Sequence, residues 1–264
     1  PRVAPKNSEV LRVCKLMVPA LFGVSVAQVN ILLDMVFASF LPVGSVSWLY
    51  FSDRLTNFPL GVFAVAIATV IMPQLSRDHA NASPQQFSKN LDWALRLILL
   101  IALPAAIGLL LLAGPLLATL LGYGQFTDRD VLMARLSLTA LALGVPAFML
   151  IKIVASGFYA QQNIKTPVKI GVFAMVCNTI LNLIFIIPFK HMGLALATSI
   201  AAFINAGLLF YYLRKRAIYR MQPGWLGYSA KLFFANGVMA FSIYLLTDPI
   251  HTWLAWGSFD RIMH

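Results

Sequence analysis

The stretch LDWALRLILLIALPAAIGLLLL, residues 91–112, decides the fold class of this 264-residue chain. A helix of about 20 largely apolar residues crosses ~30 Å of hydrocarbon, and this stretch has that length and character. Six further runs of the same kind are predicted as spans at 17–41, 55–72, 132–154, 168–187, 194–213 and 232–246, the last being the weakest. The chain is therefore expected to be an all-α, polytopic membrane helical bundle with about seven transmembrane helices.

The composition supports a membrane protein and excludes an ordinary soluble enzyme. Apolar residues make up 60% of the chain and charged residues 11%, and its mean hydropathy is +0.81. A soluble domain holds roughly 45–50% apolar and about 25% charged residues. The runs are continuously apolar instead of alternating over about 10 residues, so a transmembrane barrel is not expected either.

Lys and Arg gather in alternate loops, which predicts an orientation. Thirteen lie in one set of loops, and the four in the other are Arg54, Arg129, Lys190 and Arg261. Cytoplasmic loops retain positive charge, so the start of the chain is placed in the cytoplasm and topology, not nucleic acid, explains the net charge of +11. Arg96, Arg135 and Lys152 fall near span ends, where we expect them to snorkel to the interface.

Neither catalysis nor a transition-metal site is indicated by the sequence. Cys14 and Cys177 have no CxxC or Cys/His spacing, and the four histidines are not paired as ligands. A nucleophile with its base and a Gly-rich phosphate loop are also missing. We therefore expect neither an enzyme nor a cofactor.

A carboxylate and a guanidinium, Asp53 and Arg54, open the second predicted span. Arg54 offers a planar fork of donors suited to phosphate oxygens, and inside the membrane it could grip an anionic headgroup. The alternative is that the pair lies at the water interface and marks the start of the helix. Pro59 frees the carbonyl of Leu55, so a bend or local opening is expected around Pro59 and Gly61.

A second polar group combines Asp34 of the first span with Asn178 and Asn182 of the fifth and Thr198 of the sixth. Asn178 and Asn182 are four residues apart and share a helical face. Their oxygen atoms could surround a small monovalent cation. A protonatable Asp34, or hydrogen bonding that only holds helices together, are the alternatives.

Four ordered stretches of the chain carry a family resemblance. They are Phe37-Ala38-Ser39-Phe40-Leu41 with Gly44-Ser45-Val46-Ser47-Trp48, then Asp53-Arg54-Leu55 with Phe58-Pro59 and Gly61-Val62, then Tyr123-Gly124-Gln125-Phe126-Thr127, and finally the segment from Gly157-Phe158-Tyr159 to Pro167-Val168-Lys169. Through them the chain resembles the MurJ (MviN) lipid flippases of bacterial cell-wall synthesis, in the superfamily of the MATE exporters.

The resemblance implies a fourteen-helix transporter of two six-helix lobes plus two further helices. Such a transporter moves lipid-linked peptidoglycan precursor, lipid II, across the bacterial inner membrane. The chain opens without Met, and we expect it to be the C-terminal part. On this map 1–16 is a cytoplasmic entry segment, 17–213 the second lobe, 214–231 a basic cytoplasmic loop and 232–264 an additional helix with an outer segment. Its partners would be lipid II, membrane lipids and the missing N-terminal lobe, with no nucleic acid.

The resemblance also implies residue roles. Arg54, with Asp53 beside it, would bind the diphosphate of the lipid, while Asp34, Asn178, Asn182 and Thr198 would correspond to the sodium site of some members. Asn182 stands where those members have an acid, which weakens the expected cation site. A MATE-type exporter, an O-antigen or capsule lipid flippase and a non-transporting membrane scaffold are the alternatives.

Overall fold

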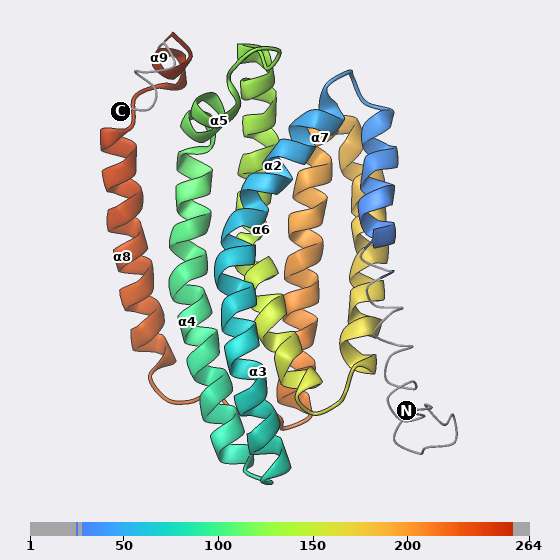
Figure 1. Ribbon diagram of the computed structural model, residues 1–264, viewed down its shortest axis with the longest axis vertical. Coiled ribbons are helices and arrows are strands. Elements are labelled where there is room, and N and C mark those ends of the chain that lie inside the picture. Colours follow the sequence, from blue (N-terminus) through green and yellow to red (C-terminus); the bar gives the residue numbers. More distant parts are fainter. Residues whose placement is uncertain (1–24, 26–27, 256–264) are drawn as a thin grey trace, which may run out of the picture.

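A computed structural model describes residue 25 and residues 28–255, and every regular element in this part is helical (Figure 1). The elements are the helix Gln28–Ser39, α2 (Ser45–Pro59), the π-helical turn η1 (Leu60–Ala64), α3 (Val65–Ala80), α4 (Pro84–Leu111), α5 (Ala113–Leu121), α6 (Asp128–Tyr159), α7 (Lys165–Lys215), α8 (Trp225–Leu246) and α9 (Ile250–Ala255). Five helical stretches of this part are long and apolar enough to cross a membrane. The predicted all-α membrane bundle is confirmed.

The seven predicted spans map onto fewer and longer helices. The fifth and sixth both lie in α7, whose two arms meet at a kink. The first span, 17–41, lies partly outside the described residues, and its described part contains the helix Gln28–Ser39. The predicted loop 214–231 is shorter in the structure, because α7 continues to Lys215 and α8 begins at Trp225.

The predicted start of the second span, at residue 55, is wrong. The helix begins at Ser45 and runs through η1 to Ala80. Polar residues before position 55 suggest a loop, but the structure provides hydrogen-bond partners for polar side chains there, as Ser52 shows. Ser52 is fully buried and its hydroxyl donates to the carbonyls of Trp48, at 2.7 Å, and of Ala134 on α6, at 2.9 Å. A hydroxyl bonded in this way costs a membrane helix little.

The two arms of α7 form an elbow at Lys190, which has φ 50° and ψ −129°. The two arms approach each other closely at Gly193, where an added Cβ would lie 2.3 Å from the carbonyl oxygen of Phe185. Only glycine fits at that distance. The elbow thus packs the arms against each other and brings residues of both to one site.

Helix α6 forms the centre of the bundle, with α2, α3, α4 and both arms of α7 packed around it (Figure 1). Its closest approach to α7 is at Gly144, where a Cβ would lie 2.6 Å from the Ser199 hydroxyl oxygen. That hydroxyl donates to the Ala140 carbonyl at 2.7 Å. Small residues therefore set this helix contact, as is common in membranes.

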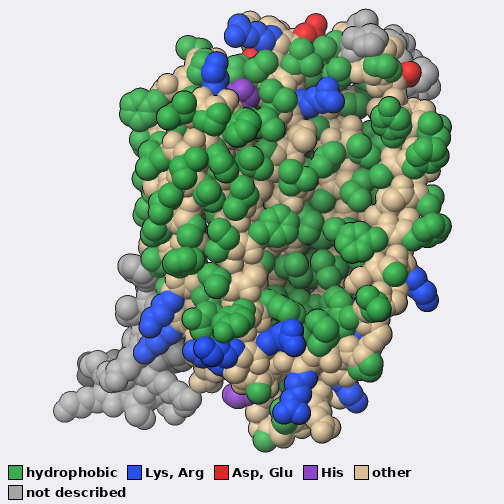
Figure 2. All heavy atoms as spheres, turned by 180° about the vertical axis from the view of Figure 1, so that it is seen from behind, with side chains coloured by type: hydrophobic (Ala, Val, Ile, Leu, Met, Phe, Trp, Pro, Cys, Tyr) green, Lys and Arg blue, Asp and Glu red, His purple; other side chains and the backbone are tan. Residues whose placement is uncertain are grey.

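The outer surface carries the pattern of a bilayer protein. Figure 2 shows an apolar belt with Lys and Arg concentrated toward one end. We call this the basic end; it holds the C-terminal turn of α3 with Arg77 and both ends of α7 with Lys165, Arg214 and Lys215. Helix α8 lies at the edge of the bundle against α4, with much of its apolar surface exposed.

Candidate functional site

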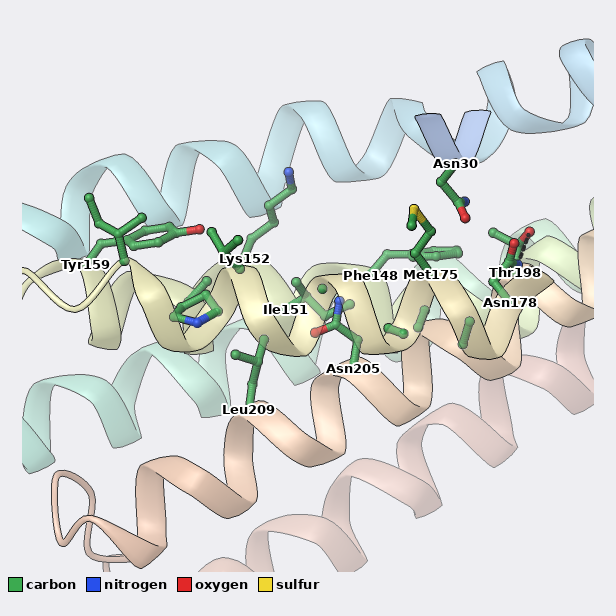
Figure 3. Close-up of a pocket in the computed structure, with 18 of the residues that line it drawn as sticks. Asn30, Phe148, Ile151, Lys152, Tyr159, Met175, Asn178, Thr198, Asn205 and Leu209 are labelled. Atoms are coloured by element: carbon green, nitrogen blue, oxygen red, sulfur yellow. Dashed lines mark hydrogen bonds between the residues drawn. The ribbon is translucent and has the colours of Figure 1, made fainter. Parts of the chain in front are cut away.

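A cavity of about 830 Å³ opens between the helix Gln28–Ser39, α3, α6 and both arms of α7 (Figure 3). We call it the lobe cavity. Its lining is mostly apolar, and the polar residues that line it are Asn30, Lys152, Tyr159, Asn178, Thr198 and Asn205. Pockets of about 300–1,000 Å³ with a few polar groups are the usual form of a small-ligand site.

The structure brings Asp34, Asn178, Asn182 and Thr198 together at one end of this cavity. Asn182 donates to Oδ1 of Asp34 at 2.6 Å, and Asn30 donates to Oδ2 at 3.4 Å. In the orientation that satisfies both of its ends, the Asn178 amide donates to Oδ1 of Asp34 and accepts from the Thr198 hydroxyl, each at 3.2 Å. Amide N–H groups therefore surround the carboxylate.

The cluster contains oxygen atoms of the kind that bind a monovalent cation, although the amides turn their N–H groups toward Asp34 in the structure. Oδ1 of Asn182 is buried without a hydrogen-bond partner, and the carboxylate, the amide oxygens and the Thr198 hydroxyl are hard ligands. The described residues contain no group of three or more His, Cys, Asp or Glu placed to hold a metal ion. Such a cation would thus rely on one carboxylate, and the amides would have to turn their oxygens toward it.

Arg54 lies well inside α2, on an exposed face of the chain, and does not line the lobe cavity. Its Nη2 donates to the Tyr50 hydroxyl at 3.1 Å, and its guanidinium lies 5.0 Å from the centre of the Tyr50 ring. Tyr50 therefore holds the guanidinium in place, and the nearby Asp53 carboxylate attracts its charge. The interpretation that Asp53 and Arg54 mark the helix start does not hold, because α2 begins at Ser45.

Asp53 and Arg54 do not form an ion pair with each other. The Asp53 carboxylate accepts from the Asn57 side chain at 2.7 Å, one turn further along α2. It is also near enough to Asp34 for the two charges to repel. The face of α2 with Asp53 and the polar end of the lobe cavity are therefore neighbours.

The sequence predicts a bend or opening at Pro59 and Gly61, and the structure has the π-helical turn η1 directly after Pro59. A π turn contains one extra residue and often occurs at functional positions in helices. A Cβ at Gly61 would meet nothing within 4 Å. The π-helical segment η1 thus follows Arg54 by between one and two helical turns along the chain and joins α2 to α3.

Sequence reasoning missed a buried cluster around Asp92, near the basic end. Asp92 accepts from Nε of Arg96 at 2.8 Å, from Nε1 of Trp225 at 2.7 Å, from the Gln222 backbone N–H at 3.3 Å and from the Tyr219 hydroxyl. Burial and the Asp92 carboxylate raise the pKa of Tyr219, so its hydroxyl remains a donor. The cluster ties the 216–224 loop to α4.

One expectation about snorkelling, that for Arg96, needs correction. Arg96 pairs with Asp92 and lies 5.2 Å from the centre of the Trp225 ring, so it holds α8 to the bundle. Arg96 follows Asp92 by four residues, a spacing that places both side chains on one face of a helix and could have predicted the ion pair from the sequence. Lys152 lines the lobe cavity.

Comparison with known proteins gives a consistent match. The family model described as "Lipid II flippase MurJ" matches residues 1–264. A curated relative named "Probable lipid II flippase MurJ", from Vibrio cholerae serotype O1, is 45% identical over 263 residues, which is 100% of this chain and 50% of the relative. The chain thus spans about half the length of the curated relatives it matches.

Solved structures agree with the sequence match. The structure titled "Lipid II flippase MurJ, inward closed conformation" superposes with a TM-score of 0.77 at 28% identity, covering 99% of this chain and 53% of that one. A multidrug resistance MATE family transporter of the MOP superfamily, in an outward-facing conformation, gives 0.67 at 16% identity, covering 88% and 52%. The second likeness concerns the fold alone.

Proposed function

Because the chain belongs to the MurJ family of lipid II flippases, we propose that it forms the C-terminal lobe of a transporter that moves lipid II across the bacterial inner membrane. The family is named for transport and not for a catalytic reaction. The observation that carries the proposal, beside the family match, is Arg54: an exposed guanidinium within a membrane helix, held by Tyr50 without a carboxylate partner.

Arg54 would contact the diphosphate of the lipid in a central cavity between this lobe and an N-terminal lobe. A charged group inside a membrane helix is costly unless it faces water, a partner or a cargo, and an anionic headgroup is such a cargo. Two or more parallel N–H donors suit phosphate oxygens, and the Tyr50 ring keeps the guanidinium in place. Asp53, bonded to Asn57, leaves Arg54 free for the cargo.

Transport would proceed by alternating access, with the two lobes rocking about the bound headgroup while the lipid tail stays in the membrane. The η1 turn after Pro59 supplies an irregular point where α2 can move relative to α3. The basic end would face the cytoplasm, so the start of this chain would also lie there.

Coupling would come from the membrane potential or from a sodium ion held by Asp34, Asn178, Asn182 and Thr198. One elementary charge moved through 100 mV releases ~2.3 kcal/mol. The bound cation would neutralise Asp34 beside Asp53, and its loss would restore repulsion between the two carboxylates. This links occupancy of the polar cluster to the position of the α2 face that carries Arg54.

Replacement of Arg54 in the complete transporter tests the diphosphate role. Charge-assisted hydrogen bonds are worth about 1.5–3 kcal/mol, so Arg54→Ala should lower flipping about 10- to 150-fold and fail to rescue cells depleted of their flippase. Arg54→Lys keeps the charge but loses the bidentate geometry, and should rescue partly. Arg77→Ala, an exposed arginine of α3 at the basic end, is the matched control and should rescue fully. Full rescue by Arg54→Ala at normal abundance refutes the role.

A further inference from the structure

Charge on the lining of the lobe cavity is unbalanced. Its lining includes one ammonium group, on Lys152, and no carboxylate. Across the described residues the one ion pair found is Arg96 with Asp92, so Lys152 has no anionic partner there. An unpaired ammonium beside a mostly apolar wall is a place for an anion that has an apolar part.

Lys152 and Tyr159 lie on α6 toward the basic end. Lys152 is seven residues, ~10 Å, before Tyr159, where α6 ends. Figure 3 shows the Lys152 side chain rising from α6 toward α3 and the Tyr159 ring lying along the cavity with its hydroxyl directed to the same side. Both groups can therefore donate into the cavity.

The surroundings attract anionic lipids. The basic end carries Arg77 of α3 and, on α7, Lys165, Lys169, Arg214 and Lys215. Basic segments next to membrane helices attract anionic lipids, and basic pockets between such helices bind their headgroups. The positive charge around the cavity thus favours an anionic lipid as its ligand.

We propose that the lobe cavity binds one anionic glycerophospholipid of the surrounding membrane, with its phosphate at Lys152 and Tyr159 and an acyl chain along the apolar wall. The wall runs over Ile151, Ala155 and Met175 toward the polar cluster. Asn205 faces this path with its buried Oδ1 unpartnered in the described part of the chain, a polar atom that a headgroup hydroxyl or an enclosed water can satisfy.

The site is separate from the proposed cargo site. Arg54 does not line the cavity, and none of the residues that line it is one to which the diphosphate role is assigned. A lipid held there would fill the space between the arms of α7 and α6 next to the cation cluster. Its binding is therefore measurable without any transport reaction.

Native mass spectrometry of the intact purified protein, with phosphatidylglycerol or phosphatidylcholine added, tests whether the site prefers an anionic lipid and whether Lys152 causes that preference. Wild-type protein should retain phosphatidylglycerol in preference to phosphatidylcholine. Lys152→Gln should bind phosphatidylglycerol about fivefold more weakly, as expected for loss of one lysine near the membrane surface. Lys89→Gln, an exposed lysine on α4 outside the cavity, should bind as the wild type does. Equal retention by Lys152→Gln and wild type overturns the proposal.

A second variant tests whether the acyl chain lies along the apolar wall of the lobe cavity. It also keeps the proposal testable if Lys152→Gln does not fold. Gly171 lines the cavity, and an added Cβ there meets nothing within 4 Å, so the side chain of Gly171→Phe can start into the cavity and should occupy part of it. It should lose phosphatidylglycerol, whereas Gly207→Phe, equally unobstructed but outside the lining, should retain it. Retention by Gly171→Phe, or displacement of phosphatidylglycerol by undecaprenyl diphosphate at equal concentration, overturns the assignment to a membrane phospholipid.

Discussion

Removal of the Asp92 carboxylate should release the 216–224 loop from the bundle. In Asp92→Ala, the Tyr219 hydroxyl, 2% exposed as a residue, and the Trp225 indole N–H lose their acceptor. The lost acceptor costs about 1–3 kcal/mol for the buried Tyr219 hydroxyl and about 1 kcal/mol for the half-buried Trp225 N–H, so ~2–4 kcal/mol of local stability is lost. The Arg96 guanidinium, partly exposed, adds less because solvent screens it.

Trypsin provides the assay, because Lys215 ends α7 and the 216–224 loop contains Arg216 and Arg220. When cleavage follows local opening, ~2–4 kcal/mol corresponds to about 30- to 900-fold faster proteolysis. Asp92→Asn keeps an acceptor oxygen, so we expect a loss of local stability of about 1 kcal/mol and a proteolysis rate about fivefold higher than that of the wild type. Lys89→Gln, on the same helix but outside the cluster, is the control. Cleavage of Asp92→Ala at the wild-type rate would refute the view that this cluster holds the loop and α8.

Two further variants follow from the packing and from the polar cluster. Gly193→Ala places a Cβ 2.3 Å from the Phe185 carbonyl and should destabilise the protein by about 1–3 kcal/mol, seen as a Tm several degrees lower, whereas Gly207→Ala meets no atom and should not lower the Tm. Asn182→Asp gives the cluster a second carboxylate, so sodium should raise its Tm more than that of the wild type, while Asp34→Asn should abolish the response; an equal sodium shift in all three proteins would remove the cation role.

The helical bundle could be predicted from the sequence because apolar runs of sufficient length have few other solutions in a membrane. The i,i+4 spacing of Asn178 and Asn182 placed both on one face of a helix, and the structure joins that face to Asp34 and Thr198. Local periodicity is enough for such features, since it decides which residues of a helix share a side.

Features that depend on partners distant in the chain could not be predicted in the same way. Ser52 reads as a loop residue until its hydroxyl meets the carbonyl of Ala134, 82 positions later. Asp92 and Tyr219 are 127 positions apart. The elbow at Lys190 requires a backbone conformation that is rare for a lysine, and tertiary packing imposes it. In each case the deciding contact is made only after the helices assemble.

Polar groups within the described helices fall into two classes, and the distinction locates function. Ser52, Ser199 and Asp92 find their partners inside the bundle, which is what a hydrocarbon environment demands of structural groups. Arg54 and Lys152 form no ion pair within the part of the chain that the structure describes. Because a membrane protein keeps a charge inside its helices only at a cost, Arg54 is the proposed contact for a cargo and Lys152 the proposed contact for a lipid.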